Sequence, residues 1–187
     1  LDKLSAKYNK EFTFVCRDGA LNYYNGTPIT SYTNYTLEDD EGRRFIAYGE
    51  ENTDELIFDS YSYLLHKDEL YDHAIDHIRS YTKDGKLCIS SIYPMFIPYE
   101  APAEMTYDEF FSYYCDQESC VSAKLILPEG AELPEELPPF QIYNLIRLDD
   151  FGCRFELEVY SLPQSDYDKL EDVTYGDIDN DKLKAIH

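Results

Sequence analysis

Apolar and polar positions alternate along this chain with two different periods, and these periods predict its secondary structure. Spacings of three and four residues indicate a short helix over 2–9 and a long helix over about 60–82. Alternation with a period of two indicates three strands in the first half, at 11–17, 29–37 and 43–49. The acidic stretch between the last two strands predicts a solvated hairpin turn.

The long helix has its own start and stop signals and a predicted core face. Asp59 or Ser60 can cap its first turn, and Gly85 lies just after its end. Apolar or aromatic residues share one face, which predicts that they are buried: Leu64, Tyr71, Ala74, Ile75, Ile78 and Tyr81.

The second half alternates strands with helices. The predicted elements are a strand over 86–93, a helix from Thr106 to about Cys115, a strand over 120–127, a helix begun by Pro138 and Pro139 that ends before Gly152, a strand over 153–162, and a last short helix begun by Ser165 or Asp168. Glu109, three residues after Thr106, completes a capping box. Since a helix that returns over a sheet makes its flanking strands parallel, we expect some parallel pairing in this half and antiparallel pairing in the first.

These patterns predict an α+β fold. It consists of an N-terminal helix, antiparallel strands and a long helix, followed by a β-α-β-α-β half with some parallel pairing. With 187 residues, of which 43% are hydrophobic, the chain is long enough to bury a core. We expect a single domain over 1–187, built from half-domains at 1–85 and 86–172 and followed by an acidic tail at 173–187.

Charge limits the partners of this chain. The net charge is −22, from 38 acidic and 16 basic residues, so the surface repels phosphates and anionic membranes. We therefore expect no nucleic-acid partner. No apolar run approaches the roughly 18 residues of a membrane-spanning helix, so we expect no transmembrane segment.

Tyrosine is abundant, with 19 residues and no Trp. Exposed doublets such as Tyr23–Tyr24 or Tyr113–Tyr114 are suited to recognition of proteins or sugars. Tyrosine is also favoured on half-buried strands and helix flanks, which is the commoner situation for any one doublet.

The five cysteines form no CxxC motif, so neither a zinc knuckle nor a thioredoxin-type site is indicated. Cys115 and Cys120 can close a small loop only if their Cα atoms approach within about 7 Å. Cys16, Cys88 and Cys153 lie in apolar strand patterns, and we expect them to be buried.

One constellation on the long helix resembles a metal site. His73 and His77 are four residues apart and Glu69 lies one turn earlier, an arrangement of ligands that can bind zinc. The HExxH motif is absent, and the helical wheel places His66 and both other histidines away from the core face. We therefore expect a solvent-exposed flank and no metal site, with Glu69, His73 and His77 as the only candidates.

No other motif carries chemistry. Asp177, Asp179 and Asp181 have the spacing of a calcium loop, but Lys182 stands where that loop requires Gly, which excludes an intact EF-hand. The chain has no GxSxG motif, P-loop or dinucleotide fingerprint. We expect no catalytic residues and no cofactor.

The opening residues LDKLSAKYNKEFTFV resemble the start of a group of small uncharacterised exported proteins and lipoproteins of Gram-positive bacteria. In that group a short helix ends in a Tyr-Gly turn and leads into a Glu-Phe strand; here Asn9 stands in place of the Gly. The chain begins at Leu1 rather than Met. The resemblance implies a mature protein outside the membrane, tethered through a preceding segment, and it transfers no functional residue.

Three functional hypotheses follow. The first is a non-enzymatic extracytoplasmic binding or scaffold protein, extracellular or anchored at the cell surface, whose partner is a protein or a carbohydrate. The second is an acidic cytoplasmic inhibitor of the immunity type, which binds a basic partner. The third is a hydrolase with an unidentified site. The resemblance and the lack of catalytic motifs favour the first.

Overall fold

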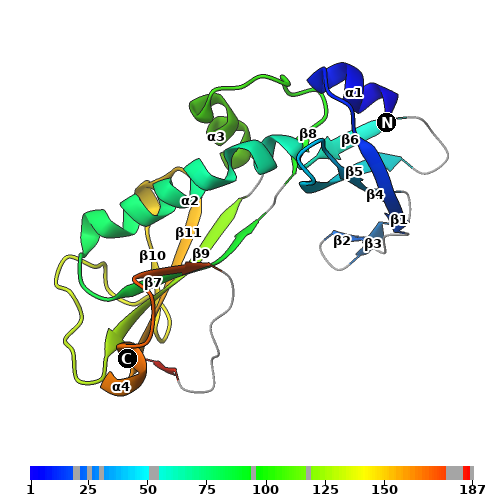
Figure 1. Ribbon diagram of the computed structural model, residues 1–187. Helices are drawn as coiled ribbons and strands as arrows, with labels where there is room; N and C mark the ends of the chain where they lie inside the picture. The colour runs from blue at the N-terminus through cyan, green and yellow to red at the C-terminus, as the bar shows by residue number, and fades with distance from the viewer. Residues whose placement is uncertain are drawn as a thin grey trace. The chain divides into compact units, whose positions relative to one another are not determined.

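The computed structural model describes residues 1–18, 22–24, 27–29, 32–50, 55–93, 96–116, 119–175 and 183–185. The chain forms two compact units (Figure 1), Leu1–Lys67 with Met95–Tyr114, and Asp68–Pro94 with Cys115–His187. The long helix continues from the first unit into the second, and the segment around α3 returns to the first. The units therefore do not divide at residue 85.

The first unit is built on an antiparallel sheet of five strands with the order β1-β4-β5-β6-β8. These strands are β1 (Thr13–Asp18), β4 (Tyr32–Glu38), β5 (Arg44–Glu50), β6 (Leu56–Asp59) and β8 (Ile97–Pro98). The other elements are α1 (Asp2–Tyr8), the hairpin of β2 (Asn22–Tyr24) and β3 (Thr27–Ile29), the first part of α2 (Tyr61–Tyr81), and α3 (Tyr107–Cys115) up to Tyr114. The predicted hairpin corresponds to β4 and β5 and is confirmed.

The predicted limits of α1, α2 and α3 agree closely with the structure. Asn9 ends α1 in the left-handed conformation at φ 47°, which Asn tolerates better than most residues. The Tyr61 N–H, at the start of α2, donates to Asp59 Oδ1 at 3.0 Å. Thr106 and Glu109 form the predicted capping box, in which the Thr106 N–H donates to Glu109 Oε2 at 2.8 Å.

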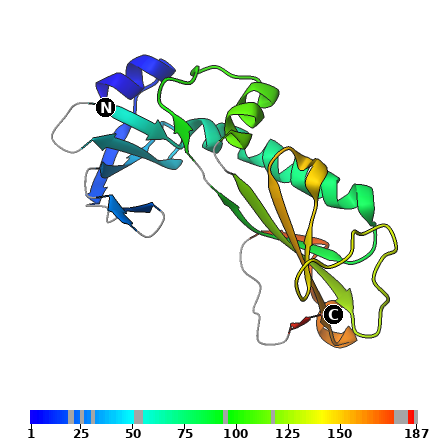
Figure 2. The same cartoon turned by 180° about the vertical axis from the view of Figure 1, so that it is seen from behind.

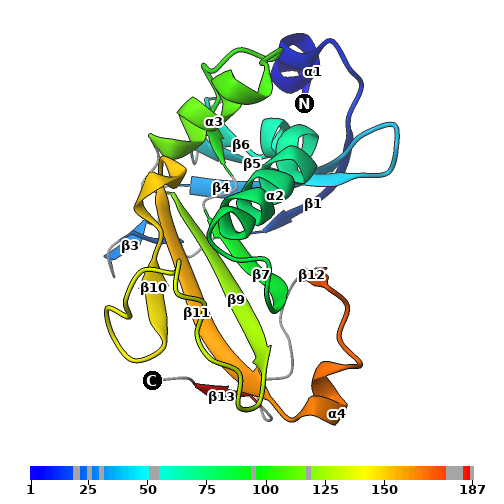
Figure 3. The ribbon, with the colours of Figure 1, turned by 90° about the vertical axis from the view of Figure 1, so that its left-hand side faces the viewer.

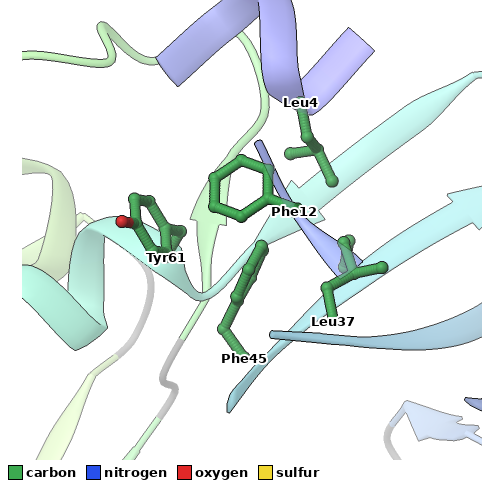
Figure 4. Packing of buried hydrophobic residues seen from close by; sticks show 6 residues of the cluster. Leu4, Phe12, Leu37, Phe45 and Tyr61 are labelled. Carbon is green, nitrogen blue, oxygen red and sulfur yellow. The ribbon is translucent and has the colours of Figure 1, made fainter. Parts of the chain in front are cut away.

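Aromatic rings fill the core of the first unit (Figure 4). The ring of Phe12 contacts those of Phe45 and Tyr61, with both centroid distances at 4.9 Å. Leu4 of α1 and Leu37 of β4 pack beside them and are buried. Because edge-to-face rings add to the energy of burial, this cluster holds α1 against the sheet.

The second unit contains a mixed sheet with the order β10-β11-β9-β7-β12, and β13 also pairs with β11. The strands are β7 (Lys86–Tyr93), β9 (Cys120–Pro128), β10 (Leu145–Arg147), β11 (Arg154–Leu162), β12 (Val173–Tyr175) and β13 (Lys184–Ala185). In Figures 1 and 2 the part of α2 that belongs to this unit runs along one face of the sheet. Figure 3 shows β9, β11 and β10 side by side.

Burial in the second part of α2 follows the predicted face only partly. Ala74 and Ile78 are fully buried, as predicted. Tyr71 and Tyr81 are only half-buried. Leu70, which was not assigned to the core face, is fully buried.

Strand directions in the second unit agree with the sequence prediction only in part. β9 and β11 are parallel and β12 is parallel to β7, as expected for this half. However, β7 and β9 are antiparallel although α3 lies between them in the chain. The reason is that the intervening segment contributes β8 to the sheet of the first unit instead of returning directly.

The prediction of a helix that begins at Pro138 and Pro139 is wrong. This segment contains β10 and the short 3-10 helix η1 (Asp149–Phe151) instead, while the last predicted helix is present as α4 (Gln164–Tyr167). Leu145 pairs with Glu158 of β11, and the Gln141 N–H donates to the carbonyl of Leu145 at 2.8 Å. Pairing with the edge of β11 therefore outweighs the local preference for a helix.

Candidate functional site

A hollow of about 610 Å³ lies on one face of the sheet in the first unit. α1 forms one side of it, and β1, β4, β5 and β6 form the remainder. The residues that line it are Leu1, Asp2, Lys3, Leu4, Phe14, Tyr35, Leu37, Ala47, Gly49, Glu55 and Leu56.

Strand register brings these side chains onto one face. Phe14 of β1 lies opposite Leu37 of β4, and Tyr35 lies opposite Ala47 of β5. Side chains two residues apart on a strand share a face, so this set belongs to the face that carries the aromatic core. The hollow is the continuation of the core beyond the area that α1 covers.

Gly49 gives room to the ring of Tyr35 in the floor of the hollow. A Cβ atom at position 49 would lie 3.1 Å from Tyr35 Cε2 and 3.2 Å from the carbonyl oxygen of Glu55. Any larger side chain would have to displace one of these groups. The absence of a side chain here therefore shapes the floor.

The lining of the hollow is mainly apolar. Leucine and aromatic side chains form most of the lining, and charge is confined to Asp2, Lys3 and Glu55. An apolar concavity with a few polar groups is typical of a ligand site.

A buried ionic network holds α1 in place beside the hollow. Lys7 Nζ donates to Asp59 Oδ2 at 2.9 Å, and the Tyr8 hydroxyl donates to Asp59 Oδ1 at 2.7 Å. The Asp59 side chain is completely buried, and that of Lys7 is 8% exposed. Burial and the charge of Asp59 raise the pKa of Tyr8, so its hydroxyl remains a proton donor.

β1 forms the rim of the hollow and the edge of its sheet. Within the described part of the chain, β1 pairs with β4 only. Phe14, which lines the hollow, is 48% exposed, and the adjacent Val15 is 36% exposed. A bulge between Phe14 and Cys16 changes the alternation at this point. An apolar, partly exposed edge strand is a surface on which another chain can add a strand.

The histidines of α2 are not the exposed flank that the helical wheel predicted. The ring centroids of His73 and His77 lie 4.8 and 5.2 Å from that of Phe151 in η1. His66, in the first unit, stacks on Phe110 at 4.9 Å. The helical wheel does not predict these contacts, because the aromatic residues come from other parts of the chain.

His77 is partly buried. Burial lowers its pKa, and the neighbouring His73 lowers it further, while Asp150 acts in the opposite direction. Its buried Nε2 has no hydrogen-bond partner within the described chain. Glu69 is exposed on the same helix. Among the described residues no group of three or more His, Cys, Asp or Glu side chains is placed to hold a metal ion.

The other residues singled out from the sequence have mixed outcomes. Cys88 is buried as predicted, but Cys16 and Cys153 are only half-buried. None of the five cysteines, all of which are described, is part of a disulfide, and a hydrogen bond with Cys153 lowers the pKa of Cys115. The acidic triplet at 177–181 lies outside the described residues. In the Tyr113–Tyr114 doublet the first ring is exposed and the second is buried.

Comparison with family models, with curated proteins and with solved structures finds no match for this chain. Within the described residues, none of the helices combines the length and the apolarity that spanning a membrane requires.

Sequence reasoning missed the hollow because its lining comes from α1 and four strands. The alternation over 11–17 placed Phe12 and Phe14 on one strand face, which was the only local signal. It did not distinguish the buried Phe12 from the partly exposed Phe14. That difference depends on how far α1 extends over the sheet.

Proposed function

We propose that this chain is a non-enzymatic binding protein that holds an extended segment of a partner protein. The segment adds as a strand to the edge of β1, and one of its apolar side chains enters the hollow. The observation that carries this proposal is that Phe14 belongs both to the edge strand and to the lining of the hollow. Strand addition of this kind takes affinity from main-chain hydrogen bonds and specificity from side-chain pockets.

The lining supports a protein ligand over a carbohydrate. The walls include Leu4, Leu37 and Leu56, which offer no hydrogen bonds to sugar hydroxyl groups. Removing hydroxyl groups from water without such partners is costly, whereas an aliphatic or aromatic side chain gains energy there. The net charge of −22 favours a segment that also carries basic residues.

An extracytoplasmic location is part of the proposal and rests on the resemblance of residues 1–15 to exported proteins. The partner would then be a protein at the cell surface. Protease treatment of intact cells that produce the native protein tests the location. Degradation without cell lysis supports it, and protection until lysis argues for the cytoplasmic alternative.

A displayed library of random peptides tests the binding site, using the full chain as bait. Peptides selected by the unsubstituted chain are synthesised, and their affinities are measured by fluorescence polarisation. Phe14→Ser should weaken the selected peptides by about tenfold or more, corresponding to about 1.4 kcal/mol. Val15→Ser is the matched control, because Val15 is on the same strand and partly exposed but does not line the hollow.

Two results would contradict the proposal. One is the selection of peptides that bind Phe14→Ser and the unsubstituted chain equally well. The other is the failure to enrich any peptide with an apolar residue. Circular dichroism of both variants confirms that the fold is intact.

The second candidate function, an inhibitor of a basic protein, is favoured by one feature of α2 in the second unit. Asp68, Asp72 and Asp76 are exposed at four-residue intervals, an arrangement that disfavours the helix by like-charge repulsion. Tyr175 lies close enough to Asp68 and Asp72 for their charges to raise its pKa, in addition to burial, the larger cause. Carboxylates beside an exposed aromatic ring can receive Arg side chains.

A hexa-arginine peptide tests this alternative. If the aspartates form the binding surface, replacing all three by Asn should weaken binding and reduce its salt dependence, while Phe14→Ser should not. Equal binding by the triple variant and the unsubstituted chain would reject it.

A further inference from the structure

An arginine on β1 lies beside the hollow. Arg17 is opposite Tyr35 of β4. Phe14 is opposite Leu37, two residues further along the same strand, and Tyr35 and Leu37 both line the hollow. Because paired residues of neighbouring antiparallel strands project to the same side of the sheet, Arg17 and Phe14 share the face that carries the hollow.

A hydrogen bond holds the Arg17 side chain on this face. Its Nη2 atom donates to Thr33 Oγ1 at 3.3 Å. Thr33 lies opposite Gly49, which lines the hollow, and it is buried, whereas Arg17 is exposed at the edge of the sheet. A guanidinium group has five N–H donors, so this contact leaves donors for a ligand.

Arg17 is a cation without an acidic partner within the described ranges of the chain. The Thr33 hydroxyl, with which it is hydrogen-bonded there, is neutral. Arg44 of β5, on the same sheet, instead pairs with Glu38, whose Oε2 lies 3.0 Å from Nε. In a chain with 38 acidic and 16 basic residues, an arginine that lacks an ion pair is available to a carboxylate of a partner.

We propose that the segment added to β1 carries an acidic side chain two residues from its apolar one, and that this carboxylate pairs with Arg17. This pairing rests on the proposed function, because it requires a strand on this edge. Opposite charges directly across two strands stabilise their pairing, and Arg can bind a carboxylate through two parallel hydrogen bonds. The net charge of −22 still favours basic residues at the other positions of the segment.

The spacing of the two side chains follows from the bulge in β1. Phe14 and Arg17 are three residues apart, but the residues opposite them on β4 are two apart, because the bulge lies between Phe14 and Cys16. They are therefore separated along the sheet by about 7 Å, the rise of two residues. A regular strand on the other side of β1 covers this distance with residues i and i+2, which share a face. The acidic residue comes first in an antiparallel segment and second in a parallel one.

The test measures the binding of fluorescein-labelled synthetic peptides to the full chain by fluorescence polarisation at low salt. The peptides are those selected with the displayed library, each made with Glu, Gln or Lys two residues before or two residues after its apolar residue. At one of these two positions Glu should bind about threefold or more tighter than Gln, and Lys should bind more weakly than Gln. The preferred position reports the direction of the added strand.

Charge reversal at residue 17 identifies the group that the peptide carboxylate contacts. Arg17→Glu should weaken the Glu peptide about tenfold and strengthen the Lys peptide, so that the order of the two affinities is reversed. Arg147→Glu is the matched control. Arg147 is exposed on β10 in the second unit and does not line the hollow, and its replacement makes the same change in net charge. This variant should keep the preference for Glu.

Three results would overturn the pairing. Binding that depends on Phe14 but shows no preference for Glu at either position, or a preference for Glu that persists in Arg17→Glu, would do so and leave the proposed function standing. Tighter binding of every peptide by Arg17→Ala would show that the arginine protects the edge from strand addition. Binding that does not depend on Phe14 contradicts the proposed function itself, and the pairing with it. Circular dichroism confirms that each variant is folded.

Discussion

Replacing Asp59 by Asn should strongly destabilise the first unit. The Asp59 carboxylate is completely buried and receives hydrogen bonds from Lys7 Nζ at 2.9 Å, the Tyr8 hydroxyl at 2.7 Å and the Tyr61 N–H at 3.0 Å. Asn keeps one oxygen that can accept from Tyr8 and Tyr61. Its amide group, however, would place a second donor against the ammonium group of Lys7.

The size of the effect follows from the burial of Lys7. Its side chain is 8% exposed, so without the carboxylate its charge lacks an anionic partner in a dry environment. Removing one member of a buried pair costs about 3–5 kcal/mol. The rings of Tyr8 and Tyr99, with centroids 4.8 and 5.0 Å from Nζ, offset about 1 kcal/mol of this. The net loss is about 2–4 kcal/mol, a large part of the 5–15 kcal/mol typical of a domain.

A double-mutant cycle in urea measures this pair, with unfolding followed by circular dichroism and by Tyr fluorescence, since the chain has no Trp. Asp59→Asn and Lys7→Met should each destabilise. The double variant should be less destabilised than the sum of the two by more than about 1 kcal/mol, because it leaves no unpaired charge. Asp59→Asn should also weaken peptides bound in the hollow, since α1 forms one side of it. Losses that add to within about 0.5 kcal/mol would refute the coupling.

Three further predictions concern backbone conformation and pH. Gly85→Ala should lower the free energy of unfolding by more than about 1 kcal/mol, because residue 85 has a φ of +80° and a Cβ atom there would lie 2.7 Å from Leu125 Cδ1. An unchanged urea midpoint would contradict this prediction. Asn9→Ala should lower the midpoint by an amount equivalent to about 1 kcal/mol, whereas Asn9→Gly should not, because only Ala is strained at φ 47°; equal midpoints would show that the left-handed cap contributes nothing. Burial alone would raise the pKa of Asp39, but hydrogen bonds from Arg43 and from the backbone lower this pKa overall. The ionised carboxylate therefore stabilises the fold at pH values above the pKa that Asp39 has in the unfolded chain. This stabilisation is lost as the pH falls through the pKa of Asp39 in the folded protein. The free energies of unfolding of the unsubstituted chain and of Asp39→Asn, measured in urea from pH 7 to pH 2, should therefore become more similar in acid. A difference between them that does not change with pH would contradict the reasoning.

Local patterns predict much of this fold. α1 ends at Asn9 and α3 begins with the Thr106 capping box, because these signals act within one turn of helix. The hairpin of β4 and β5 follows from alternation on both sides of an acidic turn. The predicted helix at 138–152 fails because Leu145 pairs with β11, a contact between segments more than ten residues apart.

The candidate sites were much less predictable. His73 and His77 were expected in solvent, yet both pack on Phe151, which lies in a segment expected to be helical. Proximity in the chain pairs Cys115 with Cys120, but it is a hydrogen bond with Cys153 that lowers the pKa of Cys115. In each case the deciding neighbour is distant in sequence.

The amino-acid sequence by itself determines the α+β class, most element boundaries and the acidic character of this protein, since periodicity, caps and charge are properties of short segments or of composition. The hollow and the enclosure of His77 arise from pairing between distant strands and from the area of sheet that α1 covers. Such features depend on which backbone hydrogen bonds form between segments, and a one-residue change of register would turn each strand's side chains to the opposite face.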